Sequence, residues 1–158
     1  MHHAITVLGR RQLQRWLQLL LFSRGTNVDL AHNPLLQLAA LRGRFMELLA
    51  EKLLPGQRDL RDPAFIVGLM SVVPTALGMT MTDVLAQIAA GNDVRAALTH
   101  RQGPLGQLFA LTERYDDNDI AGTRALLAAY GAAGTLGLLG EILANALAWV
   151  QQLGMDAN

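Results

Sequence analysis

The residues of this chain that could carry out hydrolytic chemistry are four histidines, two serines and a cluster of aspartates. Metal-dependent hydrolysis of phosphoesters requires histidine and aspartate side chains that converge on a divalent cation and activate water. The histidines are His2, His3, His32 and His100, and none of them is followed by an aspartate. The sequence therefore contains no adjacent His-Asp pair, and His32 and His100 fit better as turn and helix-end residues.

Other kinds of catalytic or cofactor site find equally little support. The absence of cysteine excludes disulfides, thiolate metal sites and cysteine nucleophiles. Ser23 or Ser71 could serve as a nucleophile only with a suitable base, and neither lies in a nucleophile elbow. A calcium-binding loop that begins at Asp117 would place Ala121 and Ala128 at ligand positions. We therefore expect no cofactor, no metal and no enzymatic activity.

A basic group near the N-terminus is the candidate interaction surface. Arg10, Arg11, Arg15 and Trp16 lie in a predicted amphipathic helix over residues 9–23. The arginines could contact an acidic partner, a phosphate group or a membrane surface. The alternative is an ordinary solvated face on a core helix.

Composition predicts one helical domain that lies in the cytoplasm. The 158 residues are 51% hydrophobic and 16% charged, which favours a folded core over disorder. The N-terminus lacks the pattern of a signal peptide. Nine basic and five acidic residues lie at or before Asp62, and four basic and eight acidic residues follow it. This dipolar distribution can orient a partner, but it is too weakly basic to indicate nucleic-acid binding.

Proline, glycine and capping residues divide the chain into helices, and no strand is predicted. The resulting fold class is all-α, a compact bundle of about seven helices. Asn33 and Asp62 are expected to cap helices whose first residues are prolines, and Pro74 is expected to restart the second of these. The expected helices cover residues 9–23, 34–54, 63–73, 81–90, 93–100, 104–115, 120 onward and 136–153. The apolar stripe of the helix at 34–54 is expected to consist of Leu38, Leu41, Phe45, Leu48 and Leu49.

Four glycines at every third position, from Gly131 to Gly140, have two interpretations. They could allow two helices to pack closely, or they could loosen a connection between helices, and we favour the second. The uncharged stretch from Ala125 to Gly140 is about 16 residues long, shorter than the roughly 20 residues of a membrane span. We expect no transmembrane segment.

An ordered set of motifs gives the chain a family resemblance. The set comprises Ala4–Trp16, the Arg42–Glu47 helix motif, Ala64–Ser71, Gly103–Gly106 and Ala146–Trp149. It resembles the HD-related output domain, a branch of the HD metallophosphohydrolase superfamily. In bacterial signalling proteins this domain is found C-terminal to EAL cyclic di-GMP phosphodiesterase domains.

The resemblance implies a function without catalysis. Ser71 and Val72 stand where catalytic members of the superfamily carry the His-Asp pair. The resemblance implies that residues 1–158 correspond to the later part of one output domain, without its first helices and without an EAL domain. We therefore expect a signalling domain that contacts another protein or an EAL domain of its own protein. The alternatives are residual metal-dependent phosphohydrolase activity and the sensing of a small apolar ligand in a methionine-rich core.

Loss of the first helices would also expose an apolar stripe on the helix at residues 9–23. Leu13, Trp16, Leu17 and Leu20 form this stripe. Large exposed apolar patches are uncommon on monomers, so we expect a homo-oligomer that forms through it. Trp16→Glu should then give a folded monomer in analytical ultracentrifugation.

Overall fold

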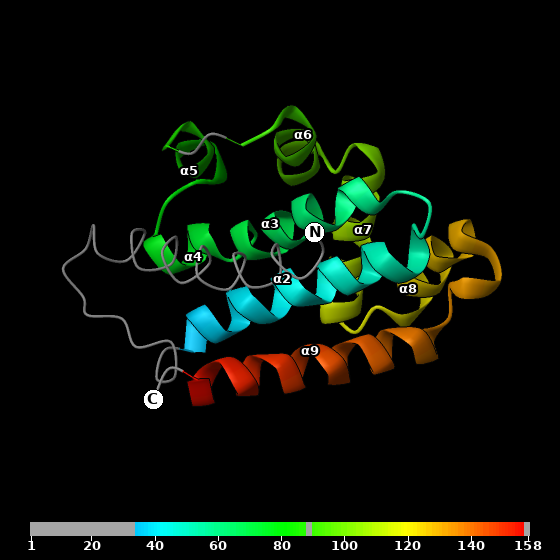
Figure 1. Cartoon of the computed structure of the whole chain (residues 1–158). Helices are drawn as coiled ribbons and strands as arrows, with labels where there is room; N and C mark the ends of the chain where they lie inside the picture. Colours follow the sequence, from blue (N-terminus) through cyan, green and yellow to red (C-terminus); the bar gives the residue numbers. More distant parts are fainter. Residues whose placement is uncertain (1–33, 88–89, 157–158) are drawn as a thin grey trace.

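The computed structural model describes residues 34–87 and 90–156, and these residues confirm the all-α prediction (Figure 1). No strand occurs in these two ranges. The elements are α2 (Pro34–Leu53), the 3-10 turn η2 (Arg58–Leu60), α3 (Arg61–Met70), α4 (Val73–Leu77), α5 (Met81–Gln87), α6 (Asn92–His100), α7 (Gly103–Asp116), α8 (Ile120–Leu127), the 3-10 segment η3 (Ala128–Ala133) and α9 (Leu136–Asp156).

Most helix boundaries follow the local signals in the sequence. Pro74 lies in the first turn of α4, as expected for a restarted helix. The carboxylate of Asp119 accepts a hydrogen bond from the backbone N–H of Gly122 and so caps α8. The prediction for Asp62 is wrong: α3 already begins at Arg61, because η2 leads directly into it. Asp62 therefore lies inside the first turn and does not cap it.

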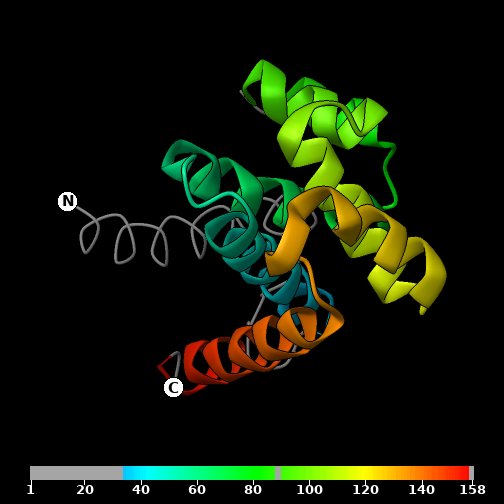
Figure 2. The ribbon, with the colours of Figure 1, turned by 90° about the vertical axis from the view of Figure 1, so that its right-hand side faces the viewer.

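Helix α2 lies at the centre of the arrangement, with α3 on one side and α9 on another (Figures 1 and 2). Phe45, Leu48 and Leu49 are buried as predicted. Leu38 was expected in the same stripe but is 40% exposed. The buried face of α2 is shifted because two helices pack on it, and it includes the small residues Ala39, Ala40 and Gly43.

Glycines allow α2 and α3 to cross at close range. A Cβ atom at Gly68 would collide with the backbone carbonyl of Arg42, and one at Gly43 would lie 3.0 Å from the ring of Phe65. Neither helix could approach so closely with a larger residue at Gly68. This crossing fixes the end of α3 against the middle of α2.

The glycines from Gly131 to Gly140 do not bring two helices together. Gly131 has a left-handed backbone (φ 66°) and Gly134 follows the end of η3, so these two form the loosened connection we expected. Gly137 and Gly140 lie in α9, and a Cβ atom on either would meet nothing within 4 Å. Among the residues described, no one helix combines the length and apolarity needed to cross a membrane; only the pair 120–133 and 136–152, bent by 91°, does so jointly.

Candidate functional site

The candidate interaction surface predicted from the sequence lies outside the described residues. Arg10, Arg11, Arg15 and Trp16 all precede α2. The predicted self-association through the same helix lies there as well. Both stay predictions.

Ser71 and Val72 lie at the end of α3, where the family resemblance places the lost His-Asp pair. The hydroxyl of Ser71 donates a hydrogen bond to the carbonyl of Gly68 at 2.6 Å. It also accepts one from Nη1 of Arg42 at 3.3 Å. Val72 is 4% exposed and belongs to the core. Both residues therefore have structural partners.

Arg42 connects this position to a third helix. Its Nη2 lies 2.7 Å from Oδ2 of Asp116, the last residue of α7. The side chain of Arg42 is 26% exposed and that of Asp116 is 40% exposed. We refer to Arg42, Ser71 and Asp116 as the Arg42 junction, because the three residues join α2, α3 and α7 through one guanidinium group.

Asp116 of the junction and Asp119, three positions later, have opposite electrostatic environments. Burial raises the pKa of Asp116, and the positive charge of Arg42 opposes that rise only in part. The hydrogen bond from the backbone N–H of Gly122 lowers the pKa of Asp119, and Arg114 lowers it further. The carboxylate of Asp119 is thus stabilised as an anion, whereas ionised Asp116 is not fully compensated.

The Arg42 junction has the chemistry of a structural brace. The Ser71 hydroxyl donates to a carbonyl and accepts from a cation, so none of its recorded partners is a base that could remove its proton. In residues 34–87 and 90–156, no group of three or more His, Cys, Asp or Glu side chains could hold a metal ion. The guanidinium group of Arg42 is itself the positive charge that pairs with Asp116 in the junction.

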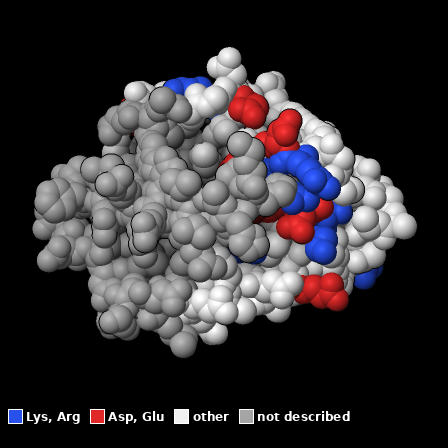
Figure 3. All heavy atoms as spheres, in the orientation of Figure 1, with Lys and Arg blue, Asp and Glu red and all other residues white. Residues whose placement is uncertain are grey.

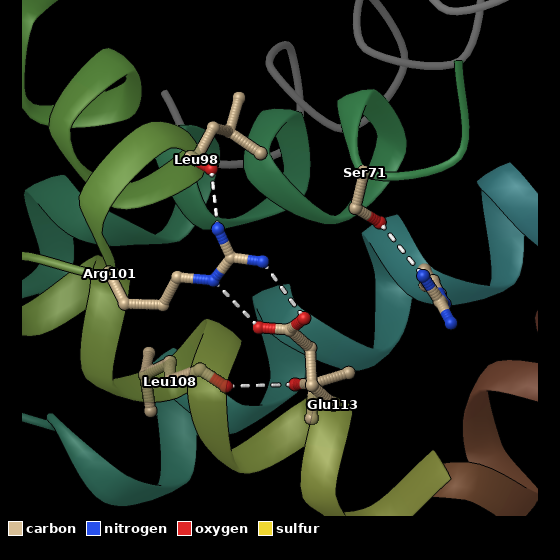
Figure 4. Close-up of polar contacts among 7 residues, drawn as sticks. Ser71, Leu98, Arg101, Leu108 and Glu113 are labelled. Atoms are coloured by element: carbon tan, nitrogen blue, oxygen red, sulfur yellow. Dashed lines mark hydrogen bonds and ion pairs between the residues drawn. The ribbon is translucent and has the colours of Figure 1, made fainter. Parts of the chain in front are cut away.

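A second arginine fixes the turn between α6 and α7 (Figure 4). Nε and Nη2 of Arg101 each donate to Glu113 at 2.9 Å, and Nη1 donates to the carbonyl of Leu98 at 2.9 Å. Its guanidinium lies 4.7 Å from the ring centroid of Phe109. Arg101 itself has a left-handed backbone (φ 52°), which is unusual for a residue with a side chain. His100 is exposed in the last turn of α6, in agreement with a helix-end role.

A third arginine lies where α2, α3 and α9 meet. Arg44 is paired with Glu47 at 2.8 Å, and its guanidinium lies 5.6 Å from the ring centroid of Trp149. The rings of Trp149 and Phe65 pack edge to face at 6.1 Å. The sequence singled out Arg42–Glu47 and Ala146–Trp149 as separate motifs, but nothing in it showed that they touch.

The described structure also contains an open hollow where α8, η3 and α9 meet. Its volume is about 410 Å³. The lining residues are Arg124, Leu127, Ala128, Gly134, Thr135 and Leu136. Sequence reasoning missed this site, because its lining residues are ordinary and come from three elements.

Comparison with known proteins gives one informative match. The chain is 32% identical over 88 residues to the cyclic di-GMP phosphodiesterase CdgJ of Vibrio cholerae. The matched region covers 56% of this chain but only 20% of that protein, so the chain spans a small part of its relative's length. No protein-family profile matches the chain. No solved structure matches it either.

The match relates this chain to cyclic di-GMP signalling proteins. The motifs in the sequence resemble a domain of the same class of signalling proteins, so the two observations agree. The name of the relative describes a whole protein, of which four-fifths has no counterpart in the matched region.

Proposed function

We propose that this chain is a non-catalytic, cytoplasmic regulatory domain of the HD-related output type, and that it acts by contact with a cyclic di-GMP phosphodiesterase domain or another signalling protein. The observation that carries the proposal is the 32% identity to one-fifth of a cyclic di-GMP phosphodiesterase. A segment of that size inside a signalling enzyme has the dimensions of an accessory domain.

The Arg42 junction supports a role without catalysis. Ser71 and Val72 lie where the family resemblance places the metal-binding pair of catalytic members, and Arg42 supplies a fixed cation beside Ser71. A permanent guanidinium at this position disfavours the approach of a divalent metal ion by charge repulsion. The junction instead strengthens the contact of three helices, which suits a domain that transmits contact or conformation.

The proposal can be tested with the relative from Vibrio cholerae. The hydrolysis of cyclic di-GMP would be measured for CdgJ that lacks the matching region, with and without this chain added in trans. We expect the chain to bind with micromolar affinity in isothermal titration calorimetry and to change the rate of hydrolysis. The chain alone, with Mn²⁺ or Mg²⁺, should hydrolyse neither cyclic di-GMP nor bis(p-nitrophenyl) phosphate.

Hydrolysis of either substrate by the purified chain would contradict the proposal, provided that Ser71→Ala or Asp116→Asn abolished it. Intact CdgJ serves as the positive control for the assay. Absence of both binding and a rate change would contradict the contact with a phosphodiesterase.

The hollow between α8 and α9 favours one second candidate function, the sensing of a small ligand. Its volume of about 410 Å³ lies within the range of small-molecule sites. The two functions differ in what they require: a sensor binds its ligand without any protein partner.

A further inference from the structure

Apart from Arg124, the surface around the hollow carries little charge. Between Ala125 and Gly140 the sequence contains no acidic or basic residue. Many side chains there are both small and exposed, namely Ala125, Ala128, Ala129, Ala132, Ala133 and Thr135. Figure 3 shows few acidic or basic atoms at the right-hand end of the molecule, where Figure 1 places η3 and the start of α9. Soluble surfaces ordinarily mix charges along such a length, so this face is suited to contact with another molecule.

The hollow borders this uncharged face, and its lining combines polar and apolar groups. Leu127 is buried and Leu136 is half-buried, and both line it. Gly134 maintains the wall, because a Cβ atom there would collide with the carbonyl of Leu127. An aliphatic or aromatic side chain of a partner fits a volume of about 410 Å³.

The electrostatics of the hollow favour an acidic group. Arg124 is its charged lining residue, and it is exposed at the surface. Among the described residues it forms no ion pair, whereas Arg42, Arg44, Arg101 and Arg114 all do. The 21-residue helix α9 also begins at Leu136, so the positive end of its dipole lies at the same wall.

We propose that this hollow binds an acidic and apolar peptide segment of a protein partner. One apolar side chain enters between Leu127 and Leu136, and a neighbouring carboxylate pairs with Arg124. The uncharged surface beyond the hollow favours a peptide, since a small molecule would leave it uncovered. This inference rests on the proposed function and names the chemistry of the partner that the domain recognises.

Three probes test the proposal by NMR titration of the ¹⁵N-labelled chain. They are acetyl-Glu-Leu-Phe-Glu-amide, its charge-reversed form acetyl-Lys-Leu-Phe-Lys-amide, and N-acetylglutamate. We expect the acidic peptide to shift the amide signals of Ala128, Gly134 and Thr135. The basic peptide should bind about fivefold more weakly, the factor that corresponds to ~1 kcal/mol for a surface ion pair.

Two variants and their matched controls locate the site. Arg124→Glu should reverse the preference between the two peptides, whereas Arg58→Glu, at another exposed arginine, should preserve it. Ala128→Phe should fill the mouth of the hollow and abolish binding. Ala121→Phe should not, because Ala121 is an exposed residue of α8 that does not line the hollow.

Several results would overturn the proposal. These are equal affinity for both peptides, signal shifts confined to other elements, or binding that persists in Ala128→Phe. Shifts of equal size with N-acetylglutamate would assign the hollow to small acids and not to peptides. Failure here, together with binding and a rate change in the CdgJ assay, would remove the site but leave the proposed function intact. Peptide binding at the hollow with no effect on CdgJ would support the site and contradict the proposed function.

Discussion

Helix packing is tight at the Arg42 junction and open at the corner formed by α8, η3 and α9. At the junction, helices approach as closely as glycine permits, and an arginine joins three of them. At the corner, the connecting segment opens at Gly131, and a hollow of about 410 Å³ remains between the elements. Charge is concentrated in the first region and nearly absent from the second.

The comparison shows that residue type alone does not assign a role. Gly68 is required because the carbonyl of Arg42 lies directly against it, whereas Gly137 faces open space. Arg42 is bound to Ser71 and Asp116, whereas Arg124 has no ion-pair partner among the described residues. The same residue is therefore structural in one region and available for recognition in the other.

Alanine in place of one glycine from each region should give the largest difference in stability between the two regions. Gly68→Ala should destabilise the chain by about 2 kcal/mol or more, because the added Cβ would force α2 and α3 apart. Gly140→Ala, inside α9, should stabilise it by about 0.5–1 kcal/mol, since alanine has the higher helix propensity and meets no neighbour there. Urea unfolding followed by circular dichroism measures both changes.

Circular dichroism of the folded proteins provides the control, because both variants should keep the wild-type helix content. Equal effects at the two positions would contradict the tight crossing of α2 and α3.

Substitution of Arg42 should also destabilise the chain more than substitution of Arg124, but the difference should be smaller than for the two glycines. Arg42→Met should cost about 1–2 kcal/mol, because Asp116 loses its counter-charge and Ser71 loses its donor. Arg124→Met should change stability by less than about 0.5 kcal/mol, as is usual for exposed residues without partners. Chemical denaturation at constant pH measures both.

A double-mutant cycle separates the ion pair from packing of the arginine stem. The loss caused by Arg42→Met should be smaller in an Asp116→Asn background. Strict additivity of the two substitutions would show that the ion pair contributes nothing.

The smallest expected effect is a difference in pH dependence between two aspartates three positions apart. Burial raises the pKa of Asp116, so its folded state favours the neutral form and loses stability as pH rises through that pKa. The hydrogen bond from Gly122 lowers the pKa of Asp119, so its stabilisation is present at higher pH and lost as pH falls. As pH rises from about 3 to about 6, the free energy of unfolding of Asp116→Asn should increase relative to that of wild type. The free energy of unfolding of Asp119→Asn should decrease relative to wild type over the same rise.

Unfolding free energies measured at several pH values across that range test the prediction. Wild type supplies the reference at each pH, so the titration of all other groups cancels. The same sign of change in both variants would contradict the difference in environment.

The sequence determined the local structure of the described part well, because helix ends depend on nearby residues. Pro34, Pro74 and Pro104 lie in the first turns of helices, and Asp119 caps α8 through its own side chain. The exception, Asp62, also has a local cause, since the 3-10 turn before it displaced the start of α3.

Tertiary structure alone decided which residues meet. Arg42 and Asp116 are 74 positions apart, and no pattern in the sequence joins them. Leu38 followed the predicted apolar stripe but stayed exposed, because the positions of α3 and α9 define the buried face of α2. The hollow likewise depends on the angle between helices. Side-chain periodicity specifies which faces are apolar, whereas the contacts between helices far apart in the chain determine which of those faces are covered.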